Sequence, residues 1–201
     1  MAAAGRDGHV QLTDLGFAKH LDAAGGMHRA FTLCGTPDYM APEIISRKGH
    51  GAAADLWSAG IVLYEMCSGD GKTPFHSDIP AVTYRKVLRG RMSMPAHLRG
   101  SSTEALISAL LQPDPVARLG CGVAGQGIAD VMAHAFFTGQ GGWDWPAMAG
   151  RAAVPPWLPS QGREMGAEDY SHFSGAKIED DEDDEDYGAI SEEDARLFDD
   201  L

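Results

Sequence analysis

Two carboxylates stand where the neighbouring residues would let them do chemistry. Asp14 follows the alternating segment 9–13 and precedes the flexible Gly16, a pattern that suits a hard cation such as Mg²⁺. A turn aspartate before a glycine has the same pattern, so this motif alone is weak. Glu65 lies inside the apolar segment 52–68, where a carboxylate needs a partner. A cationic group of a substrate and an internal cation are the two candidates.

The elements that would position these groups are mostly helical. Segment 52–68 is apolar nearly all round, which predicts a helix that is buried on every side at the centre of the core. The Ser-Ser-Thr-Glu sequence at 101–104 is a capping signal for an amphipathic helix that ends before Pro113. Weaker helical candidates are 78–89 and 127–137. The pattern of segment 9–13 is typical of a short strand.

Charge and cysteine content exclude several classes of protein. The 201 residues have a net charge of −13, and the acidic excess lies in residues 168–201, so that the remainder is neutral. Such a chain would repel phosphate, which argues against nucleic-acid binding. Cys34, Cys67 and Cys121 form no Cys-x-x-Cys pair, which favours a reducing cytoplasmic or nuclear compartment over a disulfide framework or zinc site. No run approaches the roughly 18 apolar residues of a membrane span.

Three motifs follow one another in an informative order. They are Thr-Asp-Leu-Gly at 13–16, Gly-Thr-Pro-Asp-Tyr-Met-Ala-Pro-Glu at 35–43 and Asp-Leu-Trp-Ser-Ala-Gly at 55–60. In this order and at these distances they resemble the second half of a eukaryotic protein kinase domain. The resemblance implies a mainly α fold, a kinase-like large lobe that lacks the small lobe and the catalytic loop, with an extended C-terminal tail. It also implies ATP and Mg²⁺ as cofactors, with Asp14 as a metal ligand.

Segment 29–43 is similar to the activation and substrate-docking segment of the AGC serine/threonine kinases, and most similar to that of the cyclic-nucleotide-dependent kinases, which respond to cAMP or cGMP. The resemblance makes Thr32 the activation phosphosite and Lys19 a partner of its phosphate. An ordinary loop threonine is the alternative.

The same resemblance assigns substrate contacts. Leu33, Pro37 and Met40 match the pocket for the residue that follows the phosphoacceptor. Thr36 matches a threonine that contacts the catalytic base, and Glu65 matches a carboxylate that pairs with an Arg upstream of the phosphoacceptor. We therefore expect protein substrates that carry Arg upstream of Ser or Thr.

Three further residues match structural positions of the family. Glu43 and Arg118 match a buried ion pair that joins the docking segment to a later loop. Asp55 would favour the start of a helix through the helix dipole. In the family, the carboxylate at this position binds the backbone of the catalytic loop. Without that loop we expect Asp55 to be a buried carboxylate that lacks its partner.

Residues 138–201 resemble the C-terminal extension of AGC kinases, with an acidic run at 179–186. The resemblance places Phe173 near the nucleotide, and it docks Phe198 and Leu201 on the small lobe. A disordered acidic tail is the alternative reading.

Residues 1–137 are then expected to form a partial kinase domain without catalytic residues. The sequence contains neither a Gly-rich phosphate loop nor a His-Arg-Asp-x-x-x-x-Asn motif, and residues 1–7 resemble nothing in the catalytic loop. One hypothesis is a truncated chain, inactive alone, of a serine/threonine kinase that phosphorylates basic proteins and has a regulatory domain or subunit as partner. The other is a catalytically dead half-kinase that acts as a docking or decoy module for kinase regulators or substrates.

Overall fold

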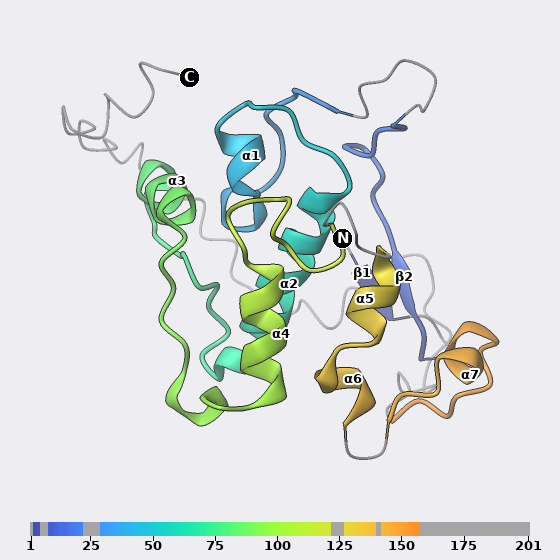
Figure 1. The fold of residues 1–201 in the computed structure, drawn as a ribbon. Coiled ribbons are helices and arrows are strands. Elements are labelled where there is room, and N and C mark those ends of the chain that lie inside the picture. The colour runs from blue at the N-terminus through green and yellow to red at the C-terminus, as the bar shows by residue number, and fades with distance from the viewer. Residues whose placement is uncertain (1, 5–7, 22–28, 122–126, 140–141, 157–201) are drawn as a thin grey trace, which may run out of the picture. The chain divides into compact units, whose positions relative to one another are not determined.

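The computed structural model describes residues 2–4, 8–21, 29–121, 127–139 and 142–156 (Figure 1). Over these residues the chain is mostly helical, as the sequence predicted. In chain order the elements are β1 (Ala2–Ala4), β2 (Val10–Leu12), the 3-10 helix η2 (Pro37–Tyr39), α1 (Pro42–Ile45), α2 (Ala53–Ser68), α3 (Pro80–Arg89), the 3-10 helix η3 (Ala96–Leu98), α4 (Ser102–Leu110), α5 (Ile128–Met132), α6 (Ala135–Thr138) and α7 (Trp145–Ala149). No helix of the described residues has the length and apolarity that a membrane crossing requires.

The described residues fall into two compact units. The first takes in the described parts of Met1–Gly16 and Asp144–Gly188, and the second takes in the described part of Phe17–Trp143. In the first unit, β1 pairs antiparallel with β2, with Ala2 opposite Leu12 and Ala4 opposite Val10. The strand predicted at 9–13 is confirmed, whereas its partner was not predicted.

Helix α2 provides the core of the second unit and confirms the helix predicted at 52–68. Its residues Trp57, Ile61 and Tyr64 are buried. A Cβ atom added at Gly60 would lie 2.9 Å from Leu110 Cβ and 2.9 Å from a Leu111 methyl carbon. The missing side chain of Gly60 therefore lets α2 and the end of α4 approach each other closely.

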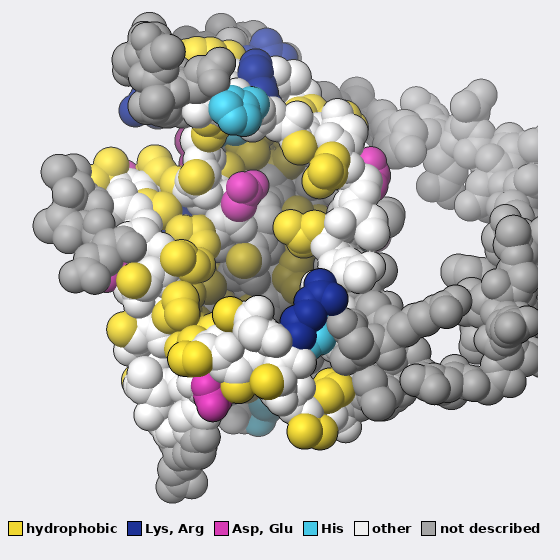
Figure 2. Space-filling view, turned by 90° about the vertical axis from the view of Figure 1, so that its right-hand side faces the viewer, with side chains coloured by type: hydrophobic (Ala, Val, Ile, Leu, Met, Phe, Trp, Pro, Cys, Tyr) yellow, Lys and Arg dark blue, Asp and Glu magenta, His cyan; other side chains and the backbone are white. Residues whose placement is uncertain are grey.

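One face of α2 departs from the prediction of burial on every side. The side chains of Val62 and Met66 are 43% and 78% exposed, and Asp55 and Ala59 are exposed as well. These four positions recur at helical spacing and form one stripe, which we call the exposed α2 stripe. A local pattern shows that a helix is apolar, but only the packed neighbours decide which faces are covered. Figure 2 shows one face of the molecule, on which many hydrophobic side chains lie among few charged ones.

The cap of α4 forms nearly as the sequence predicted. Ser101 Oγ accepts a hydrogen bond from Glu104 N at 3.1 Å. The Glu104 carboxylate accepts from Gly100 N, one residue before the position that a standard capping box uses. The candidate at 78–89 forms α3. The candidate at 127–137 forms two short helices: α5 ends at Met132, and His134 begins α6 by accepting a hydrogen bond from Phe136 N.

Candidate functional site

A buried ion pair joins α1 to the start of α2 and to the loop after α4. Arg118 donates two hydrogen bonds to Glu43, at 2.8 and 3.0 Å, and its side chain is fully buried. It donates further bonds to the carbonyl oxygens of Ala53 (2.6 Å) and Gln112 (3.1 and 3.2 Å). Its guanidinium carbon lies 5.2 Å from the centre of the Trp57 ring. Every charge of this pair is met by a fixed partner, which leaves no capacity for a ligand.

Tyr39 and Met40, which precede Glu43 in the chain, contact α2. Ser58 Oγ donates to Tyr39 O at 2.9 Å, and Met40 is 3% exposed within the core around Trp57. Met40, which the family resemblance assigned to a substrate pocket, therefore packs inward in this structure. Leu33 is 40% exposed and Pro37 is half-buried, so their side chains are the accessible members of that predicted set.

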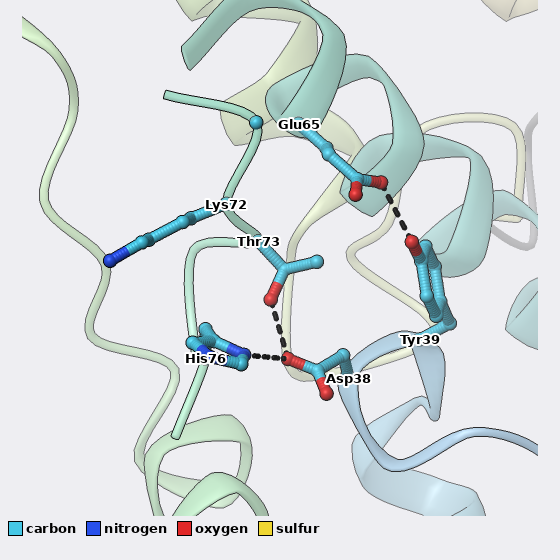
Figure 3. Close-up of a pocket in the computed structure, with 7 residues that line it drawn as sticks. Asp38, Tyr39, Glu65, Lys72, Thr73 and His76 are labelled. Carbon is cyan, nitrogen blue, oxygen red and sulfur yellow. Dashed lines mark hydrogen bonds and ion pairs between the residues drawn. The ribbon is translucent and has the colours of Figure 1, made fainter. Parts of the chain in front are cut away.

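An open pocket of about 330 Å³ lies beside η2 in the second unit. Its walls come from η2, from the C-terminal half of α2 and from the loop that follows α2 (Figure 3). The residues that line it are Asp38, Tyr39, Glu65, Gly71, Lys72, Thr73 and His76. Two carboxylates thus share one small, solvent-accessible space.

Glu65 has a partner in this pocket that the sequence did not suggest. Tyr39 donates its phenolic proton to Glu65 Oε2 at 2.7 Å. The hydrogen bond to this carboxylate, followed by burial, raises the pKa of Tyr39 to about 12. A hydroxyl donor does not neutralise a carboxylate, and among the described residues nothing donates to the other oxygen, Oε1. The negative charge of Glu65 remains available to a cation.

Asp38 is the second carboxylate, and sequence reasoning missed it. Its Oδ1 accepts a hydrogen bond from Thr73 Oγ1 at 2.6 Å and lies 3.2 Å from His76 Nδ1. These contacts depend on how the loop after α2 folds back, so no spacing rule could have found them. Asp38 also directly precedes Tyr39, and this adjacency to a predicted docking segment was the available signal. The ammonium end of Lys72 points away from both carboxylates (Figure 3).

Asp14 belongs to the first unit and has an unusual backbone. Its φ is 59°, in the left-handed region that residues other than glycine seldom adopt, and such strain tends to gather at functional sites. Gly16 N donates to Asp14 Oδ1 at 3.3 Å. The described residues hold no group of three or more metal-binding side chains. A single exposed carboxylate is compatible with Mg²⁺, which usually takes one or two carboxylates together with phosphate oxygens and water.

The residues expected near a phosphorylated loop lie at the surface. Thr32, Thr36 and Lys19 are exposed, and no hydrogen bond or ion pair between Lys19 and Thr32 occurs in the described structure. The segment just before Thr32 is anchored, because Ala30 and His50 exchange backbone hydrogen bonds of 2.7 and 2.8 Å. The role of Thr32 stays a prediction.

The expectation that Asp55 is a buried carboxylate is wrong. Asp55 is exposed in the first turn of α2, on the exposed α2 stripe, and the N-cap residue Ala52 makes no side-chain cap. A hydrated carboxylate carries no desolvation penalty and needs no ionic partner. Its position still suits the dipole of α2.

The tail predictions lie outside the described residues. Phe173, Phe198, Leu201 and the acidic run 179–186 fall there, and their roles stay predictions. The described start of the extension contains α7, whose first turn is capped by Asp144 Oδ1, which accepts from Ala147 N at 2.9 Å.

A comparison with protein families matches residues 3–137 to the protein kinase domain. The matched region includes residues 3–7. The expectation that residues 1–7 resemble nothing in the catalytic loop stays a prediction. The match ends at residue 137, and the division into 1–137 and 138–201 stays a prediction.

Individual relatives are kinases by name, and two of the three that follow are named as cyclic-nucleotide-dependent. The chain is 44% identical over 154 residues to the human cAMP-dependent protein kinase catalytic subunit PRKX. The aligned region covers 77% of this chain and 39% of PRKX. It is 39% identical over 154 residues to the Caenorhabditis elegans cGMP-dependent protein kinase egl-4, covering 76% and 18% respectively. It is 35% identical over 167 residues to human ribosomal protein S6 kinase alpha-2, covering 83% and 21%. The chain thus spans about two fifths or less of the length of these relatives.

Proposed function

The chain belongs to the protein kinase family, and we propose that it is part of an AGC-type serine/threonine kinase that acts in the cytoplasm or nucleus. In the complete enzyme, phosphoryl transfer from ATP would reach Ser or Thr of proteins that carry Arg upstream of the acceptor. One observation carries the substrate assignment: Glu65 Oε1 is unpaired among the described residues in an open pocket that also holds Asp38.

The pocket suits a guanidinium group for a geometric reason. Tyr39 holds Glu65 Oε2, so the carboxylate is oriented before a ligand arrives, and less conformational entropy is lost on binding. Because the pKa of Tyr39 is raised to about 12, the phenol stays a donor over the whole physiological pH range. A guanidinium presents several N–H donors in a rigid fork that matches the geometry of a carboxylate such as Glu65.

The nucleotide would be held elsewhere. We assign Asp14 as the residue that would hold Mg²⁺, whose charge neutralises the nucleotide phosphates when bound. The left-handed backbone of Asp14 and its bond from Gly16 orient this carboxylate. Thr32 is proposed as the activation phosphosite, with Lys19 as a cation for its phosphate. Since the sequence contains no His-Arg-Asp-x-x-x-x-Asn motif, we expect residues 1–201 alone to show no phosphotransfer.

A second function is favoured by a separate observation. The exposed α2 stripe presents Val62 and Met66 to solvent on the longest described helix of the chain. Exposed apolar groups on a core helix are typical of a surface that another polypeptide covers. The chain would then be a docking or decoy module for regulators or substrates of an intact kinase.

The substrate pocket can be tested without catalysis. A fluorescently labelled Ser peptide with Arg upstream is titrated with chain 1–201, alongside the same peptide carrying uncharged citrulline in place of Arg. We expect the Arg peptide to bind about three- to tenfold more tightly, and Glu65→Gln to remove most of that difference. The matched control is Glu104→Gln on α4, outside the pocket, which should leave the difference intact. Equal binding of the two peptides would contradict the proposal.

A further inference from the structure

The imidazole of His76 lies between two carboxylates at the edge of the pocket that Asp38 and Glu65 line, which we call the acidic pocket. Its Nδ1 is 3.2 Å from Asp38 Oδ1, and its Nε2 is 3.6 Å from Asp78 Oδ1. Asp38 comes from η2, and Asp78 precedes α3, so the ring bridges two separate segments. The His76 side chain is 44% exposed, which leaves it in contact with the solvent.

The other charged groups around His76 are accounted for. Lys86 of α3 donates to the His76 carbonyl oxygen at 2.6 Å rather than to the ring. Lys72 directs its ammonium group away from the carboxylates (Figure 3). Glu65 lies across the pocket, where Tyr39 holds it. The ring is therefore the basic group closest to Asp38 among the described residues.

We propose that His76 is a specificity-determining residue of this pocket, and that loss of its proton strengthens the binding of a cationic substrate side chain. The inference rests on the proposed function, since it assumes that the pocket binds Arg. When protonated, His76 neutralises Asp38 and repels an incoming guanidinium. When neutral, it leaves the full charge of Asp38 to the substrate.

Because Thr73 holds Asp38, protonation of His76 changes the charge of the pocket and not its shape. The Thr73 hydroxyl donates to the same oxygen of Asp38, and because this bond does not involve the proton of His76, we expect the carboxylate to keep its position. The proton and the substrate cation then compete for one anionic site. By linkage, each must weaken the binding of the other by the same factor.

The test compares the Arg and citrulline peptides on chain 1–201 between pH 5.5 and 8, the range in which histidine side chains change charge. The affinity ratio of the two peptides should rise about two- to fivefold with pH, which is the magnitude expected for an exposed ion pair. His76→Asn should give a high ratio that no longer changes with pH. The matched control is His97→Asn, because His97 bonds the Cys67 carbonyl oxygen outside the pocket and should not affect the pH dependence.

A second measurement uses the unmodified chain. If proton and guanidinium compete, the NMR titration of the His76 ring should shift to lower pH when the Arg peptide is added, and should not shift with the citrulline peptide. The inference is overturned if the ratio exceeds one but is flat with pH, or if His76→Asn keeps the pH dependence; the proposed function then stands. If the ratio is one at every pH and Glu65→Gln changes nothing, the proposed function fails as well.

Discussion

The Glu43–Arg118 pair and the acidic pocket both contact residues 37–45, yet they treat charge in opposite ways. Arg118 is fully buried, and its donors are taken up by Glu43 and by two backbone carbonyl groups. In the pocket, Glu65 accepts from a hydroxyl group and Asp38 from a hydroxyl group beside the His76 ring, and each carboxylate has an oxygen with no donor among the described residues. A fully satisfied pair makes a permanent joint, whereas a half-satisfied carboxylate retains affinity for a ligand.

The largest expected effect comes from breaking the buried pair. Arg118→Ala would leave the Glu43 carboxylate buried without a partner, and we expect the free energy of unfolding to fall by about 3–5 kcal/mol. Urea denaturation followed by circular dichroism measures this loss. The double variant Glu43→Leu with Arg118→Met removes both charges and should recover much of the stability. If Arg118→Ala costs under about 1 kcal/mol, the pair is not the structural joint described.

The second-largest effect is expected from a substitution in α2. This helix supports both regions, because it supplies Ala53 to the ion pair and Glu65 to the pocket. Gly60→Ala would place a Cβ atom 2.9 Å from Leu110 and Leu111, and we expect a loss of about 1–3 kcal/mol from overpacking. Ala59→Gly on the exposed α2 stripe is the control, with a loss of at most about 1 kcal/mol from helix propensity. A stabilised Gly60→Ala variant would show that α2 and α4 are not closely packed.

A smaller effect on stability should accompany a clear effect on binding in the pocket. Tyr39→Phe removes the hydrogen bond to Glu65, and we expect a loss of about 0.5–1.5 kcal/mol in stability. The Arg peptide should bind more weakly, because Glu65 is no longer oriented. Thermal melts and peptide titrations on the same sample separate the two outcomes. Unchanged peptide affinity would mean that the orientation of Glu65 by Tyr39 does not matter for binding.

The smallest effect appears only in alkaline solution. The pKa of Tyr39 is raised to about 12 by the Glu65 hydrogen bond and by burial, so its contribution to stability is complete below pH 10 and is lost as pH rises through 12. Burial also raises the pKa of Tyr64, so ultraviolet titration should show more than one tyrosine that ionises late, and Tyr39→Phe should reduce this late fraction by one tyrosine. In Glu65→Gln the same tyrosine should ionise at lower pH. If the late part of the titration is unchanged in Tyr39→Phe, the assignment is refuted.

Local patterns predicted the helices better than the site. The segment 52–68 and the Ser101 cap were readable because periodicity and capping depend on neighbouring residues. The exposed α2 stripe was not readable, since coverage depends on what packs against a helix. Likewise, β1 was missed because Ala2–Ala4 carries no alternation of its own and becomes a strand through pairing with β2.

The pocket shows the same limit at the level of single side chains. Glu65 was singled out because a carboxylate in an apolar segment is conspicuous. Its actual partner, Tyr39, and the Asp38–Thr73–His76 contacts join residues far apart in the chain. Only the folded loop after α2 brings them together.

The surroundings of Trp57 make its intrinsic fluorescence a probe of the packing around the Glu43–Arg118 pair. The indole stacks on Phe75 with a centroid distance of 5.7 Å and an interplanar angle of 8°, and Arg118 covers it. Its N–H has no hydrogen-bond partner in the part of the chain that the structure describes. An indole that is buried away from water should emit at short wavelength, unlike Trp143, which is 47% exposed. The short-wavelength part of the tryptophan emission therefore reports whether the packing around Trp57 and Arg118 is intact, with no added dye.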